Sequence, residues 1–274
     1  MPKTKKQLPA VVDPRDEIVA QGNDLIRHSR FQLSALEQNV IYFAMSKVRP
    51  GDKDFMRLTF TVEEFCRVCG IKTNGGNPSG QEYRRIKGAV KSVSDKSVWA
   101  EYPNGAEVLI RWFDTAQIQP DTGEMSIVLS QSIKPYLIGL IERARAGGEG
   151  YTQTLLLTHL ALQSKYSKRL YEVLKSYLYS SGSMEKIYKE TYLEYEIDEL
   201  KDLLNACNYG RYPDLRRFVL EVAEREINEV ADITVSYQPI KKGRKITSIS
   251  FTFRHKENMD RITARQAAMD TLDM

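Results

Sequence analysis

The stretch from residue 209 to residue 255 constrains the fold most strongly, because a helical pattern is followed there by two alternating segments and a basic turn. Pro213 stands at a first helical position with an acidic residue directly after it, which is typical of a helix N-terminus. Residues 232–237 and 246–253 alternate between apolar and polar side chains, which predicts two antiparallel strands joined near Gly243. The stretch therefore predicts a helix that precedes a β-hairpin.

The predicted helix has one apolar face and one charged face. Its apolar residues recur at helical spacing and are expected to form a buried stripe: Leu215, Phe218, Val219, Val222 and Val230. Arg217 is expected to point away from the core, with Arg216 on the flank of the helix.

The connection between the two predicted strands, residues 238–245, is strongly basic. It carries Lys241, Lys242, Arg244 and Lys245, and no acidic residue occurs between positions 233 and 256. A helix followed by a cationic hairpin is the arrangement of a winged helix. In that arrangement the helix enters a groove of DNA, and the hairpin, called the wing, contacts phosphate groups.

Composition sets wide limits on the function. The 274 residues, 42% of them apolar, suffice for two domains with their own cores. No stretch has the roughly 18 uncharged apolar residues of a membrane span, and the N-terminus lacks an apolar leader, so we expect no membrane contact and a cytoplasmic location. Three cysteines argue against a disulfide framework. A net charge of +4 is only mildly basic, so the local distribution of charge says more about nucleic-acid binding.

The first half is expected to consist of a flexible tail, residues 1–22, and a domain over residues 23–148. Ser34 and Glu37 have the spacing of a capping box at a helix start. The expected elements are, in order, a helix at 34–48, a strand at 55–60, a helix from a second capping box at 61–64 to Gly70, a loop at 74–80, a helix at 81–94, strands at 98–113 and 125–129, and a helix at 134–145.

The second half is expected to begin within the glycine-rich segment 147–150 and to form a domain over residues 149–256. Its expected elements are helices at 152–162 and 165–179, a strand and helix at 193–207, and the stretch described first. Residues 257–274 are predicted to be a C-terminal tail, either helical or disordered.

Two segments of the second half repeat segments of the first. Residues 193–200 share apolar spacing and an acid with residues 58–65, at an offset of 135 (193 − 58). Residues 215–218 match residues 83–86 at an offset of 132 (215 − 83). The shared order predicts an α+β fold of two tandem winged-helix domains related by internal duplication. A chance likeness between amphipathic helices is the alternative.

Three pieces of the chain resemble the initiator Rep family, the tandem winged-helix replication initiators of theta-replicating iteron plasmids. They are NDLI at 23–26 with LSALE at 33–37, SKYSKRLYE at 164–172, and YPDLRRFVL at 212–220 followed by INE at 227–229 and KKGRK at 241–245. The resemblance covers residues 23–256. The glycine-rich loop at 74–80 departs from it.

The resemblance implies a function and a set of partners. Family members bind repeated origin sequences, called iterons, in double-stranded plasmid DNA and recruit host helicase and initiator proteins. It also implies a homodimer in equilibrium with a monomer, with the monomer active at iterons and the dimer repressing its own gene.

The candidate DNA-binding residues fall into two sets. The stronger set combines the second predicted recognition helix and the wing: Arg211, Arg216, Arg217, Lys241, Lys242, Arg244 and Lys245. Arg217 is expected to read a guanine edge, and the wing cations to hold phosphate. The weaker set lies on the helix at 81–94: Gln81, Arg84, Arg85 and Lys91. For both sets, the alternative is a solvated charged face.

The sequence gives little support for an enzyme, a cofactor or a metal site. Cys66 and Cys69 have C-x-x-C spacing without a second ligand pair, so buried thiols are expected there. The acids at 194–202 are explained by a strand end and a first helical turn. No phosphate-binding G-x-x-x-x-G-K motif and no His-x-His pair occurs. A transcriptional repressor of the same fold and, from another class, a rolling-circle nicking endonuclease remain alternatives.

Overall fold

The computed structural model describes residues 13–49, 51–73, 80–101, 106–119, 121–148, 150–178 and 188–274. The first half comprises η1 (Pro14–Asp16), β1 (Ile18–Gly22), α1 (Asn23–His28), α2 (Ala35–Met45), β2 (Leu58–Thr61), α3 (Val62–Val68), α4 (Gly80–Asp95), β3 (Ser97–Glu101), β4 (Glu107–Arg111), β5 (Phe113–Ile118), β6 (Glu124–Leu129), η3 (Gln131–Tyr136) and α5 (Leu140–Arg145). The second half comprises β7 (Tyr151–Leu155), α6 (Leu156–Ala161), α7 (Lys165–Leu178), β8 (Thr191–Glu196), α9 (Ile197–Leu203), α10 (Tyr212–Leu215), the π-helical turn η4 (Arg216–Leu220), α11 (Glu221–Val230), β9 (Ile233–Lys242), β10 (Lys245–His255) and α12 (Asn258–Asp273).

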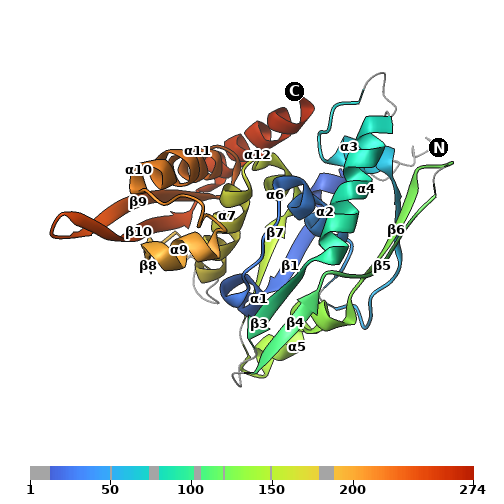
Figure 1. The fold of residues 1–274 in the computed structure, drawn as a ribbon, viewed down its shortest axis with the longest axis horizontal. Helices are drawn as coiled ribbons and strands as arrows, with labels where there is room; N and C mark the ends of the chain where they lie inside the picture. The colour runs from blue at the N-terminus through green and yellow to red at the C-terminus, as the bar shows by residue number, and fades with distance from the viewer. Residues whose placement is uncertain are drawn as a thin grey trace, which may run out of the picture.

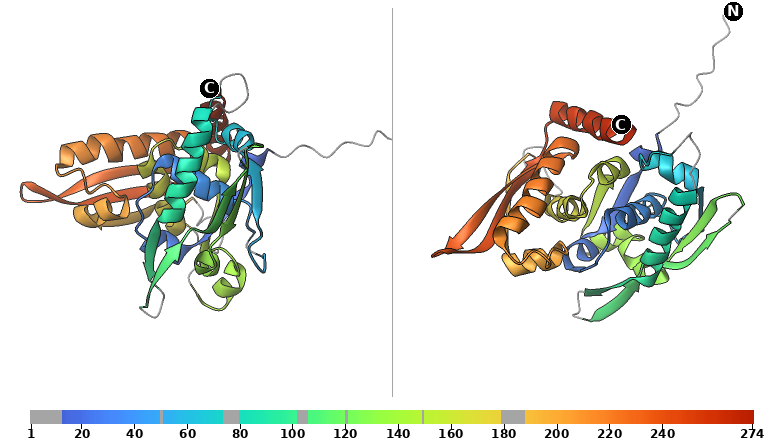
Figure 2. Two further views of the ribbon diagram at one scale, coloured as in Figure 1. Left: turned by 45° about the vertical axis from the view of Figure 1, so that its right-hand side comes forward. Right: turned by 45° about the horizontal axis from the view of Figure 1, so that its top comes forward.

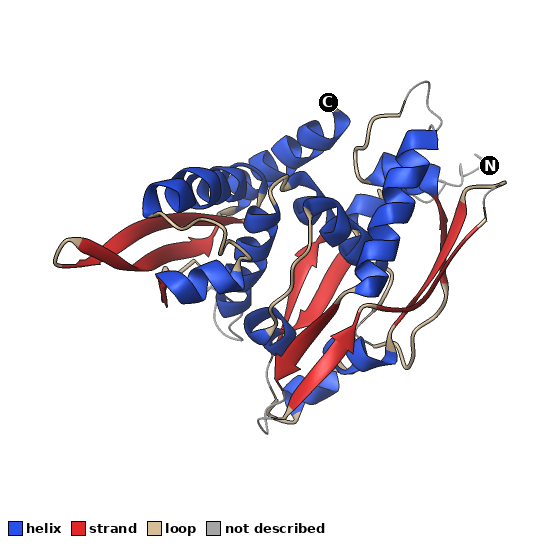
Figure 3. Ribbon diagram, viewed as in Figure 1, coloured by secondary structure: helices blue, strands red, loops and turns tan. Residues whose placement is uncertain are grey.

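The second winged-helix unit has the three-stranded antiparallel sheet β8-β10-β9. Alternate residues of β10, Ile249, Phe251 and Phe253, are buried in the common core. The helix that runs from α10 through η4 into α11 packs on α7 and on β9. β9 and β10 extend beyond the helices at the left of Figures 1 and 3, so the hairpin projects as a wing.

The first winged-helix unit repeats this topology. Its sheet has the order β2-β6-β5, in which the last strand lies between the first and the second, as in β8-β10-β9. The helices α3 and α9 correspond at an offset of 135 at both ends (197 − 62 and 203 − 68). The fold of two tandem winged helices is therefore confirmed. The first unit differs by the separate hairpin β3–β4, which is inserted between α4 and β5.

The predicted capping box forms at the start of α2. The Ser34 hydroxyl accepts from the Glu37 amide at 3.3 Å, and the Glu37 carboxylate accepts from the Ser34 amide at 2.6 Å. At α3, the Thr61 hydroxyl accepts from the Glu64 amide at 3.0 Å. Cys66 and Cys69 are buried, as predicted, and burial raises the pKa of the Cys66 thiol to about 11. Of the loop expected at 74–80, residues 74–79 lie outside the described residues and Gly80 begins α4. The Asn104-Gly105 pair, which predicts a hairpin turn within the strands expected at 98–113, also lies outside the described residues.

Ordered structure begins before the predicted position. The prediction of a flexible tail through residue 22 was wrong for residues 14–22, because Ile18–Gly22 pairs antiparallel with β7, Tyr151–Leu155. This pairing also corrects the helix expected at 152–162, whose first part is the strand β7. It links segments on either side of residue 149, where the division between domains remains a prediction.

The helix expected at 134–145 is interrupted. Residues 131–136 form a 3-10 helix that contains Pro135, and α5 begins only at Leu140. Gly139 between them has φ +68°, a left-handed conformation that ends one segment before the next starts.

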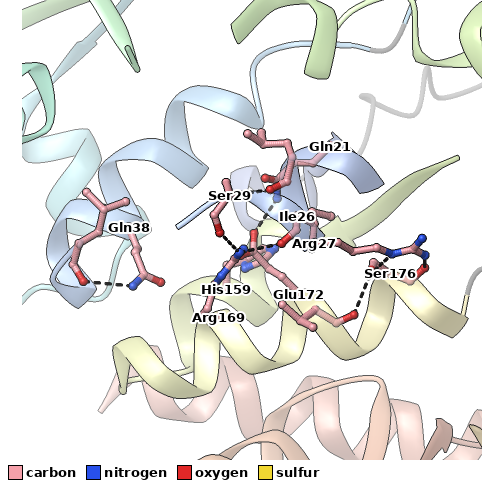
Figure 4. Close-up of polar contacts among 12 residues, drawn as sticks. Gln21, Ile26, Arg27, Ser29, Gln38, His159, Arg169, Glu172 and Ser176 are labelled. Atoms are coloured by element: carbon pink, nitrogen blue, oxygen red, sulfur yellow. Dashed lines mark hydrogen bonds and ion pairs between the residues drawn. The ribbon is translucent and has the colours of Figure 1, made fainter. Parts of the chain in front are cut away.

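α7 ties the second half to the N-terminal segment through buried polar contacts (Figure 4). The Arg169 guanidinium donates to the carbonyl oxygens of Ile26 at 2.7 Å and Ser29 at 2.8 Å, which are left free where α1 ends. One turn further along α7, the Glu172 carboxylate accepts from the Gln21 amide at 2.7 Å. These contacts hold α7 against both α1 and β1.

The C-terminal residues form a helix that returns to the first unit. α12 runs from the end of β10 toward α3 (Figures 1 and 2) and packs on α6 and α11. Arg265 pairs with Asp16 at 2.7 Å, and Asp273 pairs with Arg15 at 2.8 Å. The segment predicted as a tail, helical or disordered, is therefore a helix that connects the two units. Among the described residues, no helix is long and apolar enough to cross a membrane.

Candidate nucleic-acid interface

The outward face of the helix at 212–230 carries two exposed arginines, Arg216 and Arg217, which are the first two residues of the π-helical turn η4. In this turn the Glu221 amide donates to the Arg216 carbonyl, five residues back. The same spacing lets the Arg216 Nε donate to Glu221 Oε1 at 2.8 Å. This hydrogen bond is the main cause of a raised pKa for Arg216.

The π turn overturns part of the predicted apolar stripe. Leu215 and Val219 are buried as expected, but Phe218 is 46% exposed. The wider turn changes the phase of the helix, so the buried face continues through Leu220 and Ala223. Ile227 and Val230 complete it.

Arg211 and Arg217 differ in their surroundings. Arg211, at the N-cap of α10, is bound through its Nε to Asp214 Oδ2 at 2.8 Å. Arg217 makes no ion pair with any carboxylate in the part of the chain that the structure describes. Its guanidinium carbon lies 5.2 Å from the centre of the Phe218 ring. Of the three arginines predicted here, Arg211, Arg216 and Arg217, only Arg217 is thus without a carboxylate partner among the described residues. Arg225, further along the same helix, is also exposed and was not among the predicted residues.

The wing presents its cations around a two-residue turn. β9 and β10 extend to Lys242 and from Lys245, so the connection predicted at 238–245 is only Gly243 and Arg244, with Gly243 at φ +64°. Lys241, Lys242, Arg244 and Lys245 are all exposed. Within the described residues, none of them forms an ion pair.

Lys242 and Lys245 face each other directly across the hairpin. Two like charges in this position destabilise a β-hairpin by a few tenths of a kcal/mol to about 1 kcal/mol. A bound phosphate would relieve this repulsion. Residue pairs that lower stability, such as these two facing lysines, are expected at sites where the sequence is adapted to bind a ligand.

The start of α10 and the wing border one groove of about 690 Å³. Tyr212 and Pro213 line it from the helix, and Lys242, Arg244 and Lys245 line it from the wing. Lys201 of α9 adds a cation that the sequence analysis missed, and it pairs with Asp198 at 3.8 Å. The structure therefore brings the wing cations and the helix start together.

Acidic residues also line this groove, and they fit the structural explanation given for the acids at 194–202: the acids of the lining are Glu196 and Asp198. Glu196 ends β8, and Asp198 and Glu199 lie in the first turn of α9. Glu194 accepts from the Ser248 hydroxyl at 2.6 Å, across the sheet. Among the described residues, no group of three or more His, Cys, Asp or Glu side chains is arranged to hold a metal ion.

The weaker predicted set lies on the exposed face of α4, whose other face buries Ile86, Ala89, Val90 and Val93. Gln81, Arg84, Arg85 and Lys91 are all exposed, and Lys91 forms an ion pair with Asp95. Lys87 is exposed on the same helix and was missed, although its spacing from Arg84 could have indicated it. Figure 1 shows α4 in the right half of the molecule and the wing at the left end, so the two sets form separate surfaces.

The β5–β6 hairpin of the first unit corresponds to the wing of the second unit but has the opposite charge. β5, β6 and the residues described between them carry Asp114, Asp121 and Glu124 and no lysine or arginine. Of these two corresponding hairpins, phosphate contact is therefore favoured only for the wing of the second unit.

Comparisons with known proteins match both halves of the chain. Residues 18–175 match the family described as "Initiator Replication protein, WH1", and residues 196–253 match "Initiator Rep protein, WH2". The PI protein of Escherichia coli is 30% identical over 157 residues, a match that covers 53% of this chain and 47% of that protein. The chain thus spans about half the length of that curated relative.

Two solved structures are similar. The crystal structure of the Pi initiator protein in complex with iteron DNA has a TM-score of 0.68 at 23% identity and covers 89% of this chain and 99% of that chain. The WH1 domain of MSBI1.176, a replication protein isolated from a multiple sclerosis patient, covers 42% of this chain and 85% of that chain, with a TM-score of 0.28 at 18% identity. The similarity to the Pi structure supports the tandem winged-helix fold.

Proposed function

Because this chain belongs to the initiator replication protein family, we propose that it binds repeated duplex DNA at a plasmid origin and initiates replication there. The observation that carries the proposal is the groove between the start of α10 and the wing, where Lys242, Arg244 and Lys245 lie beside the helix. A duplex can be held there by a helix in the major groove and by cations on the phosphate backbone.

The two parts of this surface have different roles. Arg217 reads a guanine through paired hydrogen bonds to O6 and N7, a contact that discriminates between bases by about 1–3 kcal/mol. Lys241, Lys242, Arg244 and Lys245 bind phosphate and position the helix without reading sequence. Arg211 and Arg216 are held by Asp214 and Glu221 at the edges of the helix face, which suits them to contact the backbone.

The first unit supplies a second DNA surface through α4. Gln81, Arg84, Arg85 and Lys91 then face the next major groove, about 10 base pairs away, so that one protein covers about two turns of duplex. Opening of the duplex requires several bound copies or bending of the site, which stores deformation energy in the DNA.

The protein acts in the cytoplasm without covalent chemistry and without a cofactor. Host helicase and initiator proteins are the proposed partners, and a homodimer in equilibrium with the monomer is the proposed repressing form. A nicking endonuclease would instead leave a tyrosine-linked DNA adduct, which we expect to be absent after incubation with origin DNA.

The test is a nuclease footprint of the purified protein on DNA flanking its own gene, titrated at several salt concentrations. Protection of evenly spaced direct repeats is expected. Protection of a single inverted repeat at the promoter would favour a transcriptional repressor, and replication of an origin fragment with the gene supplied in trans separates these two functions. Absence of protection would contradict the proposal.

A further inference from the structure

Phe218 is a large apolar side chain on the face of the helix that carries Arg217. It is 46% exposed, whereas the neighbouring Leu215 and Val219 are buried. The π turn at Arg216–Leu220 is responsible, because it places Phe218 outside the buried stripe. π turns of this kind occur frequently at functional sites, so the exposed Phe218 is a candidate for contact with a ligand.

The Phe218 ring is held in place by neighbouring side chains. It stacks on Tyr209 with ring centres 5.9 Å apart and an angle of 21°. Tyr209 in turn meets Tyr166 of α7 edge to face, with ring centres 6.0 Å apart. The Arg217 guanidinium lies over the ring of Phe218. A ring supported in this way loses little conformational entropy when it binds a ligand.

The chemistry of the major groove limits what such a ring can contact. Base edges there present hydrogen-bond donors and acceptors and one kind of apolar group, the C5-methyl of thymine. An exposed phenyl ring has no hydrogen-bonding group to satisfy, so the thymine methyl is its complementary partner. Arg217 is adjacent in sequence and position, so its guanine lies close to this thymine.

We propose that Phe218 reads a thymine through its C5-methyl group, within one or two base pairs of the guanine read by Arg217. The inference rests on the proposed function, because it requires that the helix enter the major groove. It adds a preference for a thymine within one or two base pairs of the guanine in each repeat, and neither the arginines nor the wing can supply a preference for thymine.

The test replaces each thymine of the protected repeat in turn with deoxyuridine, which removes only the methyl group. Binding of the unmodified protein is expected to weaken roughly fourfold at one position, the effect of losing one buried methyl-sized group. In Phe218→Ala, binding to the thymine site should be weaker and the deoxyuridine effect should be absent. In Phe218→Leu, part of the deoxyuridine effect should remain, because leucine keeps an apolar side chain at this position.

Controls separate this inference from a structural role and from the proposed function. Met56→Ala removes another exposed apolar side chain, which precedes β2 in the first unit. This variant should show the full deoxyuridine effect. Replacing guanines with 7-deazaguanine in the unmodified protein and in Arg217→Ala locates the neighbouring base. Thermal unfolding checks that Phe218→Ala is folded.

Specific binding that is indifferent to every thymine replacement would overturn the inference while leaving the proposed function intact. A deoxyuridine effect that persists in Phe218→Ala would also overturn it. If Phe218→Ala binds repeats normally but fails to support replication in trans, Phe218 belongs to a protein contact instead. Absence of any footprint would reject the proposed function itself.

Discussion

Replacing Lys242 and Lys245 with glutamine should weaken DNA binding in a way that depends strongly on salt. These two lysines face each other across the wing and border the groove beside α10. If each binds one phosphate, the double variant releases two fewer counterions on binding. The slope of log K against log salt concentration should then become shallower by about 1.8, since each phosphate contact contributes about 0.9.

The same relation gives the loss of affinity at each salt concentration. If the variant and the unmodified protein bind equally at 1 M salt, the loss of two contacts should weaken the variant's binding roughly 60-fold at 0.1 M salt and roughly 9-fold at 0.3 M salt. The loss should be equal on specific and random duplexes, because phosphate contacts carry no sequence information. The variant wing should also be slightly more stable, by a few tenths of a kcal/mol to about 1 kcal/mol, because the repulsion between the two lysines is removed.

Fluorescence anisotropy on one duplex at four or more salt concentrations measures this slope. Lys53→Gln with Lys189→Gln is the matched control, since both lysines are exposed and Lys189 precedes β8 at the end of the sheet away from the wing. The control should keep the original slope. An unchanged slope in the wing variant, or an equal change in the control, would refute phosphate binding by the wing.

Three further predictions follow from other parts of the structure. Arg84→Ala with Arg85→Ala should remove one half of a two-part footprint, and an unchanged footprint would show that α4 does not touch DNA. Gly70→Ala should lower the free energy of unfolding by about 2 kcal/mol or more in urea titrations, because Gly70 has φ +64° and an added Cβ would lie 2.5 Å from the Leu272 carbonyl oxygen. Its control is Gly123→Ala, where φ is +66° and no atom of the described residues lies within 4 Å of the added Cβ, so that this variant should lose only about 1 kcal/mol. Burial lowers the pKa of His159 to about 3, so the unfolded chain binds a proton first as pH falls, and His159 alone should lower the free energy of unfolding below pH 6.5 by at most about 1.4 kcal/mol per pH unit. Burial also lowers the pKa of His255, to about 4, so His255 adds to the decline. His159→Gln should make the decline less steep, and an unchanged slope would assign it to other groups.

Local signals in the sequence were sufficient for much of the fold. The capping box of Ser34 and Glu37 needs only residues three apart, and it forms as predicted. The repeat between residues 58–65 and 193–200 places α3 and α9 at one offset, and the two sheets share one strand order. Patterns that depend on a few neighbouring residues, or on two copies of one pattern, can be recognised without coordinates.

Features that depend on distant partners were missed. Residues 152–155 were predicted to start a helix, but they belong to β7, because Ile18–Gly22 pairs with this segment from more than 100 residues away in sequence. The periodicity that placed Phe218 in the core assumed a regular helix, and a single π turn changes its phase. At the candidate site, the cations of the wing could be identified from the sequence, because they follow one another along the chain. Lys201, which comes from α9, and the pairing of Lys242 with Lys245 required the structure.

Photo-crosslinking to a repeat that carries 5-iodouracil in place of thymine tests the central claim most directly, because the iodine occupies the position of the methyl group in the major groove. After irradiation and digestion, the crosslinked peptides should lie in the helix at 212–230, with Phe218 as the main adduct. Crosslinks confined to other parts of the chain, in a complex that still binds the repeat specifically, would contradict the assignment of this helix as the reading element.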